Sequence, residues 1–374
     1  MKITVITTGR FHVANLAREL GELGHDVTLC SYVPKFKTKD FNLSGINHKS
    51  YFWILLPFII GQRAKSLTIS NFFNKILVLF YDSLLSKSLG KCDVCIFMSG
   101  LFIKTPMKLK EKYSTNLVVE RGSTHILTQQ NILQQILNYE PIPAFFIKRE
   151  IMAYQISDLI SVPAEHTKES FIENGVSENK IIQNPYGVNL DAFSLTSFNK
   201  EIKPTVIMVG NWCLRKGADI ILDTMKLLPN FNFLHVGAIT DIEFPFANPQ
   251  FTHIDPVSEN SLVNFYGNAH VFLLPSREEG LALVQLQALA CGLPVVHTYR
   301  TGASDLKKYI TNHNMIITVQ EKPIDIKNGI ETAYEFRMNN QYINPLSDLE
   351  KSNITWAAYG KRYEANLFSK LQKE

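Results

Sequence analysis

The sequence predicts an α/β protein of two domains, each built around a parallel β-sheet. Short apolar runs that suit strands alternate with amphipathic helical patterns along most of the 374 residues, and this alternation is typical of βαβ units. The alternation begins again at Pro204, after a polar stretch at residues 190–203 without a strong period. A chain of this length, with 45% hydrophobic residues, is too long for one typical domain. We therefore expect two domains of similar size that join near residue 195.

The first half opens with a strand, a helix and a second strand connected by short loops. The apolar run after Met1 predicts the first strand, and helical spacing of apolar residues from Val13 onward predicts the helix. Gly175 follows a later helical pattern, and a glycine in that position commonly ends a helix. The elements expected in this half are strands at residues 2–7, 26–31, 93–98, 116–119 and 158–162 and helices at residues 13–23 and 165–174.

The second half repeats the alternation of strand and helix. An apolar run ends in a turn at Gly210, and the next helical pattern places Ile220, Ile221 and Met225 on one face. The last pattern in the chain is amphipathic, so this final helix must pack against another part of the protein. The elements expected in this half are strands at residues 204–210, 233–237, 271–275 and 293–297 and helices at residues 218–228 and 353–371.

Composition excludes several classes of protein. A net charge of +4 and a mean hydropathy of −0.02 argue against a disordered chain and against a nucleic-acid binder with a basic tail. The five cysteines are scattered, which does not suit a disulfide framework and indicates a reducing compartment. Cys92 and Cys95 have the spacing of a redox or zinc pair, but without a second such pair a buried strand is favoured. The first residues lack the apolar core of a signal peptide, so we expect a cytoplasmic protein.

The first half carries a basic charge and one unusually apolar segment. Residues 1–150 contain 19 Lys and Arg but only 10 Asp and Glu. The segment at residues 51–60 is about half the length needed to cross a bilayer and is interrupted by Pro57. Two interpretations stay open: the segment is part of the core, or it is exposed and contacts anionic lipid together with Lys35, Lys37 and Lys39.

The most informative segment lies at residues 275–296. A strand is expected to end at Pro275, and the next helix begins near Leu281 and ends before Gly292. The free backbone amides at the start of that helix suit a diphosphate. Glu279 is placed to accept hydrogen bonds from the hydroxyls of a sugar, and Gln287 lies about two turns along the helix, within reach of a ribose. The candidate backbone contacts come from Gly280, Leu281, Ala282 and Leu283.

This segment resembles family 4 of the retaining nucleotide-sugar glycosyltransferases, which have the GT-B fold. The family typically shows Pro-Ser-x-x-Glu-Gly-Phe-Gly-Leu, a second Glu eight residues after the first, and then Ala-x-Ala-x-Gly-x-Pro-Val-Val. Glu279 matches the first Glu, whereas Gln287 stands at the second. Gln287 can still bind a ribose diol but loses the stronger charge-assisted hydrogen bond. The resemblance implies two Rossmann-like domains that face each other across a cleft, with a C-terminal helix that crosses back to the first domain.

A second match lies between the first strand and the first helix of the second domain. Residues 209–217 resemble the family's Gly-Arg-x-x-x-x-Lys-Gly, so Gly210 lies in the donor loop and Lys216 falls on the lysine that binds the diphosphate. Asn211 stands where the family has arginine. Arg215 is the nearest cation that could replace it.

In the first domain, polar residues follow two of the expected strands. Gly9 lets the backbone approach the donor phosphates, Arg10 suits a phosphate of donor or acceptor, and His12 suits an acceptor hydroxyl. The second group, after residues 116–119, contains Glu120 and His125, together with Arg121 as a further contact for the acceptor. The family's usual His-Asp or His-Gly dipeptide is missing here, so the catalytic roles of Glu120 and His125 are hypotheses.

The resemblance implies a retaining, hexosyltransferase-type enzyme that moves a sugar from a UDP- or GDP-sugar to a hydroxyl of a glycan or lipid-linked acceptor. Glu279 and Lys216 are the predicted catalytic residues on the donor side, and no metal, cofactor or nucleic acid is expected. Residues 1–190 would bind the acceptor, residues 191–352 the donor, and residues 353–374 would form the returning helix. We expect a role in surface polysaccharide or lipopolysaccharide synthesis, peripheral on the inner face of the cell membrane. The alternatives are a nucleotide-sugar epimerase and a degenerate, non-catalytic sugar-nucleotide binder.

Overall fold

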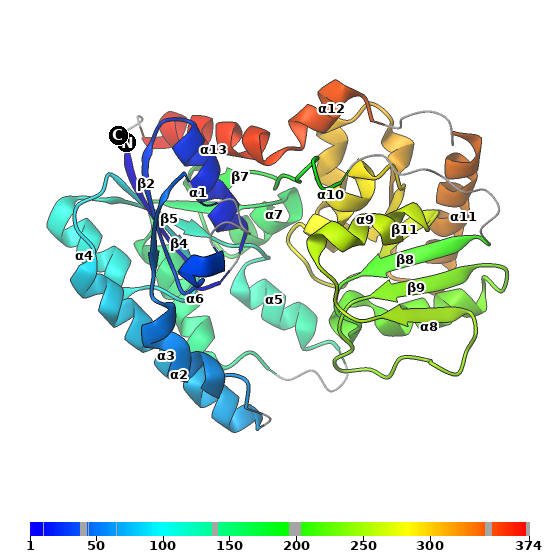
Figure 1. The fold of residues 1–374 in the computed structure, drawn as a ribbon, viewed down its shortest axis with the longest axis horizontal. Coiled ribbons are helices and arrows are strands. Elements are labelled where there is room, and N and C mark those ends of the chain that lie inside the picture. Colours follow the sequence, from blue (N-terminus) through cyan, green and yellow to red (C-terminus); the bar gives the residue numbers. More distant parts are fainter. Residues whose placement is uncertain are drawn as a thin grey trace.

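The structure is a computed structural model that describes residues 1–9, 11–37, 43, 45–64, 66–136, 141–193, 203–340 and 346–371. Two parallel sheets, one in each half of the chain, form two domains that lie side by side (Figure 1). Each sheet is wound with helices, as the alternation of apolar runs and amphipathic patterns predicted. The expected α/β class and GT-B architecture are confirmed.

The N-terminal sheet has seven strands in the order β3-β2-β1-β4-β5-β6-β7. The order reverses beside β1, which pairs with both β2 and β4, and such a reversal opens a crevice at the carboxyl ends of the strands. The strands are β1 (Lys2–Ile6), β2 (Asp26–Ser31), β3 (Asn47–Ser50), β4 (Val94–Met98), β5 (Asn116–Glu120), β6 (Leu159–Val162) and β7 (Ile181–Gln183). The helices between them are α1 (His12–Glu22), α2 (Phe52–Gly61), α3 (Leu67–Ser88), α4 (Lys104–Tyr113), α5 (Ile126–Leu133), α6 (Ala144–Ile156) and α7 (Glu165–Glu173).

The C-terminal sheet has six strands in the order β10-β9-β8-β11-β12-β13, with the reversal beside β8. Its strands are β8 (Thr205–Val209), β9 (Asn232–Val236), β10 (Phe251–Ile254), β11 (Val271–Leu274), β12 (Val295–Thr298) and β13 (Ile316–Val319). Its helices are α8 (Ala218–Lys226), α9 (Glu259–Gly267), α10 (Leu283–Ala290) and α11 (Pro323–Asn339), followed by α12 (Asp348–Asn353) and α13 (Trp356–Leu371). Short 3₁₀ helices lie at Lys35–Lys37, Glu178–Lys180, Leu214–Lys216, Tyr299–Thr301, Ala303–Tyr309 and His313–Met315.

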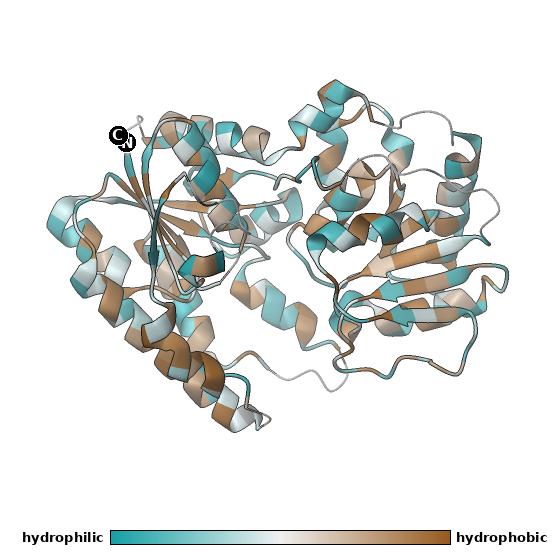
Figure 2. Cartoon of the chain, in the orientation of Figure 1, coloured by the Kyte–Doolittle hydropathy of each residue, from teal (hydrophilic) through white to brown (hydrophobic). Residues whose placement is uncertain are grey.

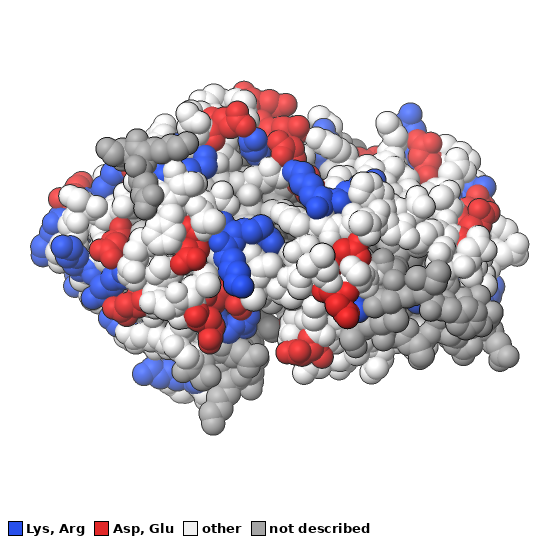
Figure 3. Space-filling view, turned by 90° about the horizontal axis from the view of Figure 1, so that it is seen from above, with Lys and Arg blue, Asp and Glu red and all other residues white. Residues whose placement is uncertain are grey.

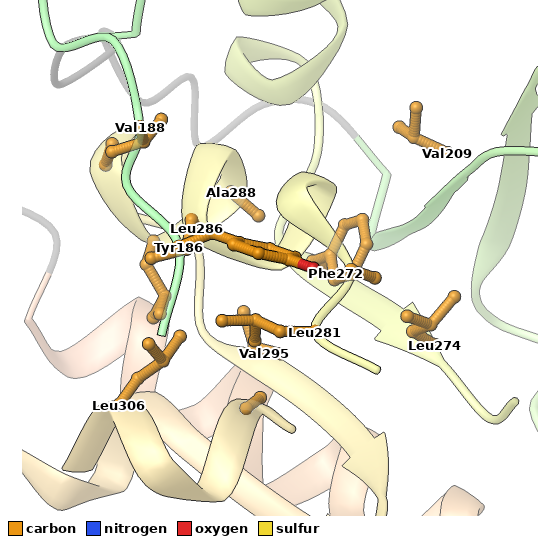
Figure 4. Packing of buried hydrophobic residues seen from close by; sticks show 14 of the residues in the cluster. Tyr186, Val188, Val209, Phe272, Leu274, Leu281, Leu286, Ala288, Val295 and Leu306 are labelled. Atoms are coloured by element: carbon orange, nitrogen blue, oxygen red, sulfur yellow. The ribbon is translucent and has the colours of Figure 1, made fainter. Parts of the chain in front are cut away.

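The core of the second domain holds α10 against the sheet. Phe272 on β11 and Val295 on β12 are fully buried beneath Leu286 of α10 (Figure 4). Burial of a side chain of this size contributes about 1.5–3 kcal/mol. This packing fixes the start of α10 at the carboxyl end of the sheet, where the sequence motif placed the donor site.

Helix α13 crosses from the second domain back to the first, as expected for the final helix (Figure 1). A Cβ on Gly360 would lie 2.4 Å from Cβ of Glu19, so α13 approaches α1 as closely as a glycine permits. Glu364 accepts a hydrogen bond at 2.8 Å from His25, and Arg362 donates to Asn184 at 3.1 Å. The end of the chain thereby ties the two domains together.

The apolar segment at residues 51–60 forms most of α2, and α3 follows it as a second helix that the sequence analysis did not identify. Only Leu55 of α2 is buried, so the core interpretation fails for most of this segment. Much of the ribbon of α2 and α3 has the colour of hydrophobic residues (Figure 2). Lys39 and most of the expected linker, residues 190–203, lie outside the described residues.

All five cysteines are free and buried. Cys95 lies within β4, and burial raises the pKa of the Cys92 thiol. Since Val94–Met98 forms a buried strand that contains Cys95, the buried-strand interpretation of this segment is confirmed.

Candidate active site

The two domains enclose a cleft of about 1450 Å³. The hollow between them is visible in the space-filling view, with charged side chains along its rim (Figure 3). The start of α1, the ends of β4 and β5, and the start of α10 all contribute, as the strand reversals at β1 and β8 predict. The lining includes Phe11, His12, Met98, Ser99, Gly122, Tyr186, Leu281, Leu283, Val284 and Gln287.

The amino end of α10 points into this cleft. Ala282 is the N-cap residue, and it makes no side-chain cap hydrogen bond. Leu281, Leu283 and Val284 line the cavity beside those amides, and Leu281 is seen below α10 in Figure 4. An uncapped helix start with partial positive charge suits an anionic group such as a diphosphate.

Lys216, Arg215 and Glu279 form a compact charged group. Lys216 donates to Glu279 Oε1 at 2.5 Å, and Arg215 lies 3.0 Å from the same oxygen. Burial alone would raise the pKa of Glu279, but the two cations hold it below its ordinary value. Arg215 also donates to the backbone oxygen of Glu278 at 2.6 Å. The structure thus joins three residues that the two sequence motifs had assigned to the donor.

Gly217 explains how the loop after β8 reaches this group. Its φ of +78° belongs to the left-handed region, and a Cβ would lie 2.4 Å from the backbone oxygen of Pro275. A glycine therefore lets the 3₁₀ turn Leu214–Lys216 pack directly against the end of β11. This close approach brings Lys216 next to Glu279.

Beside the charged group, Glu278 and Gly280 of the second domain contact Gly122, Ser123 and Gln129 of the first domain. We call these contacts the seam. A Cβ on Gly280 would lie 2.1 Å from the backbone oxygen of Gly122. The buried carboxylate of Glu278 accepts hydrogen bonds from Ser123 and from Gln129 at 3.0 Å, both in the first domain. Glu278 occupies a variable position of the sequence motif, and sequence reasoning assigned it no role.

A buried network supports His12 on the first-domain side of the cleft. His12 Nε2 lies 2.9 Å from Glu120 Oε2, and Tyr363 of α13 donates to Glu120 Oε1 at 2.6 Å. The His12 ring also packs on Tyr186 at 4.3 Å between centroids. Glu120 therefore lies behind His12 rather than on the cleft surface. Tyr363 was expected only as part of an amphipathic helix, and nothing in the sequence linked it to Glu120.

Gln287 lies on the cleft wall and is held from behind by Tyr266. The buried Tyr266 hydroxyl donates to Gln287 Oε1 at 3.2 Å. This bond fixes the orientation of the amide, while the amide nitrogen and the second lone pair of the oxygen can still bind a ligand.

Other predicted site residues lie elsewhere. His125 begins α5, its ring packs between Tyr154 and Phe171 at 5.0 Å from each, and it is not among the residues that line the cleft. Burial, with Arg121 nearby, lowers the pKa of His125 to about 4. The His125 backbone amide donates to the Ser170 hydroxyl, and its ring accepts from the Leu127 amide. Its catalytic role stays a hypothesis.

Arg121 lines the cleft, but its guanidinium is engaged by protein partners. It donates to Glu150 at 2.8 Å, to Gln129 at 2.7 Å and to the backbone of Thr124. These contacts fix the orientation of the guanidinium at the cleft wall, and the role of Arg121 as an acceptor contact stays a prediction.

The remaining predicted residues are in the loops. Asn211 is exposed, and Gly9 is half-buried with room for a Cβ in ordinary contact, so sterics do not require a glycine there. Arg10 lies outside the described residues.

Among the described residues, no three His, Cys, Asp or Glu side chains gather as a metal ion would require. In the same part of the chain, no helix combines the length and apolar character that crossing a bilayer needs.

The family model for glycosyl transferases group 1 matches residues 203–335. The matched segment, here called the group 1 domain, contains Gly210, Arg215, Lys216, Glu279 and Gln287. An uncharacterized glycosyltransferase of Methanocaldococcus jannaschii is 27% identical over 212 residues, which cover 55% of this chain and 57% of that protein. The chain spans about half the length of the curated relatives that it matches.

Solved structures resemble the whole chain, including the part outside the group 1 domain. Sucrose-phosphate synthase from Thermosynechococcus elongatus superposes with a TM-score of 0.67 at 15% identity and 99% coverage of both chains. An Anabaena protein in complex with UDP and glucose gives a TM-score of 0.65 at 12% identity, covering 99% of this chain and 100% of that chain. At these identities the likeness concerns the fold alone.

Proposed function

We propose that the protein is a glycosyltransferase that moves a hexose from a UDP- or GDP-sugar to a hydroxyl, with retention at the anomeric carbon. The observation that carries this proposal is the group of Lys216, Arg215 and Glu279 at the start of the α10 segment. The group 1 family match of the second domain supports it. The Anabaena structure of similar fold contains UDP and glucose, which favours a nucleoside diphosphate sugar as the donor.

On the donor side, the residues supply positive charge for a departing diphosphate. Lys216 and Arg215 are cations, and the first amides of α10 add the partial charge of a helix start. Such preorganised charge stabilises the developing negative charge of the leaving group most strongly in a water-excluded site. Glu279 then orients the sugar hydroxyls. With this charge supplied by the protein, we infer that transfer needs neither a metal ion nor a cofactor.

On the acceptor side, the first domain offers His12. Its Nε2 is bonded to Glu120, so the imidazole has a fixed orientation, and Nδ1 has no hydrogen-bond partner among the described residues. We infer that His12 binds the acceptor hydroxyl and that Glu120 and Tyr363 act through His12 as positioning residues. Residues 1–190 would then be the acceptor domain.

We propose a glycan or lipid-linked acceptor in surface polysaccharide or lipopolysaccharide synthesis at the cytoplasmic face of the membrane. The exposed apolar side chains of α2 and α3 in the acceptor domain favour an acceptor at a lipid surface. The domain that would bind the acceptor is also the basic half of the chain.

A donor screen tests the proposal. The purified protein is incubated with radiolabelled UDP- and GDP-hexoses and a bacterial lipid extract, and transfer is measured as label in the organic phase. The expected result is acceptor-dependent label from one nucleotide class, lost in Lys216→Met and kept in Lys226→Met, whose lysine is exposed. Conversion of the donor sugar without any acceptor would instead indicate an epimerase.

A degenerate, non-catalytic binder is the second candidate, because Asn211 and Gln287 stand where the resembled family has charges. The double variant Asn211→Arg, Gln287→Glu distinguishes the two. A gain in nucleotide affinity of about tenfold or more, with no transfer by the original chain, would favour degeneration. A loss of transfer in the variant would indicate a specialised donor site.

A further inference from the structure

Helices α2 and α3 form an antiparallel hairpin with an exposed apolar surface. Tyr51 at the start of α2 hydrogen-bonds Ser88 at the end of α3, and Ser70 near the start of α3 donates to the backbone of Gln62. Two rings, Phe58 and Phe80, pack at 5.3 Å between the helices. We define the apolar ridge as the exposed large side chains of this hairpin: Trp53, Ile54, Ile60, Ile69, Phe72, Leu79 and Phe80.

The side chains of the apolar ridge are not part of the hydrophobic core of their own domain. The inward face of the hairpin already buries Leu55, Leu77, Tyr81 and Leu85. In contrast, Trp53 is 74% exposed and Phe72 is 58% exposed. Single exposed apolar residues are ordinary, but a set gathered on one pair of helices marks an interaction surface (Figure 2).

The charges on the hairpin identify the partner. Asp82 is the only acidic residue between Phe52 and Ser88. It is buried and accepts hydrogen bonds from the backbone amides of Ile103, Lys104 and Thr105 and from Arg149. The described charged residues left on the hairpin surface are Arg63, Lys75 and Lys87. All three are basic.

We propose that the apolar ridge inserts into the interfacial layer of an anionic bilayer, with these basic residues at the headgroups. Exposed aliphatic and aromatic side chains, a tryptophan, and basic charge without exposed acid are the chemistry of interfacial helices. The basic charge of this surface complements the anionic headgroups of a bilayer, and its apolar side chains suit the layer beneath those headgroups. The inference deepens the proposed function by naming the surface at which the acceptor is met.

The hairpin is rigidly connected to the cleft. Asp82 caps α4 and holds Arg149, which in turn donates to the backbone oxygens of Gly100 and Leu101. Leu101 lines the cleft. A hairpin seated in a bilayer therefore holds the acceptor side of the cleft at a fixed position relative to the lipid.

Binding to vesicles tests the inference on the full chain. Vesicles of equimolar phosphatidylglycerol and phosphatidylcholine are compared with vesicles of phosphatidylcholine alone by flotation. We expect wild-type protein to bind the anionic vesicles at least about tenfold more tightly. The ridge variant Trp53→Ser, Phe72→Ser should lose this binding by at least about tenfold. The charge variant Arg63→Gln, Lys75→Gln, Lys87→Gln should lose only the preference for anionic lipid.

The matched control is Phe246→Ser, Leu349→Ser, which removes two equally exposed apolar side chains from the second half of the chain. It should bind vesicles like wild type. Of the three tryptophans, Trp212 and Trp356 are buried and Trp53 is exposed. A blue shift of the tryptophan fluorescence on addition of vesicles would therefore come from Trp53. Wild-type binding by the ridge variant, no blue shift, or a ridge-dependent change in oligomeric state without lipid binding would overturn the inference.

Thermal shifts with UDP and GDP are measured on the same variants. They should match wild type, because the hairpin lies outside the donor group. A failure of nucleotide binding in all variants would count against the proposed function, whereas a failure of vesicle binding alone would count against the ridge.

Discussion

At the scale of single residues, the proposed donor site depends on one carboxylate with two cations. Glu279 is ionised because Lys216 and Arg215 hold its pKa below the ordinary value against the effect of burial. A diphosphate would compete with Glu279 for both cations, so ligand binding must rearrange this group. Sequence motifs could identify these residues because each belongs to a short local pattern.

Replacing Lys216 tests that arrangement. Lys216→Met removes the cation that lies 2.5 Å from Glu279. We expect kcat/KM for transfer to fall by about 10²–10³-fold, as when one preorganised donor to the transition state is removed. Steady-state kinetics with the donor found in the screen would measure it, and kinetics within twofold of Lys226→Met would contradict the assignment.

Glu120 and Tyr363 give a second prediction at this scale. Glu120→Gln and Tyr363→Phe each weaken the support behind His12, so transfer to the acceptor should fall by on the order of 10²-fold for Glu120→Gln and less for Tyr363→Phe. Nucleotide affinity should stay at the wild-type value. If the calorimetric Kd for UDP or GDP rises while transfer falls, the network has a general structural role and does not act through His12.

Gln285 gives a prediction about stability. It is fully buried on α10, and neither amide atom of its side chain has a hydrogen-bond partner among the described residues. Because an unpaired buried amide costs about 1–3 kcal/mol, Gln285→Leu should raise the free energy of unfolding. Thermal and urea unfolding would measure it, and a lower Tm for Gln285→Leu would show that the amide has a partner.

At the scale of elements, the sequence predicted the strands and helices that carry a regular apolar period. Strand β2 and helix α8 agree with expectation to within two residues. Helix α3 was missed because its apolar residues surround it on several faces and give no clear period. The networks of Glu278 and Tyr363 could not be predicted, because their partners lie 149 and 243 positions away along the chain. Local patterns carry no information about such partners.

The seam between the domains yields the prediction for this scale. Gly280→Ala adds a Cβ that would lie 2.1 Å from the backbone oxygen of Gly122. Because this distance is too short, backbone atoms of both domains must move. We expect the domains to separate at this seam, with a larger radius of gyration by solution scattering and a lower transfer rate. Ala282→Gly is a control at the start of the same helix. An unchanged scattering curve for Gly280→Ala would show that the seam can adjust locally.

At the scale of the whole molecule, α13 and the seam hold two independent α/β units around one cleft. The alternation of strands and helices along the sequence was enough to predict the fold class. The orientation of the domains depends on contacts between residues far apart in the chain, and local sequence patterns do not reveal such contacts. Buried histidines are distributed over both units. Burial lowers the pKa values of His125, His235, His270 and His297 to about 4.

These histidines predict acid sensitivity. An unfolded chain protonates a histidine near pH 6.5, well above the folded value of about 4, so it binds more protons than the native state between these limits. The free energy of unfolding should therefore be intact above about pH 6.5 and fall steadily as the pH drops toward 4. Urea midpoints across this range would measure it. A midpoint that does not change between neutral pH and about pH 5 would contradict the prediction.

The most direct test of the account is calorimetric titration of UDP and GDP into the wild-type protein and into Lys216→Met. We expect one of the two nucleotides to bind the wild type, and we expect its Kd to rise by about tenfold or more in the variant. Equal affinity of the two proteins for that nucleotide, or no binding of either nucleotide to the wild type, would contradict the claim that the Lys216 group is a donor site.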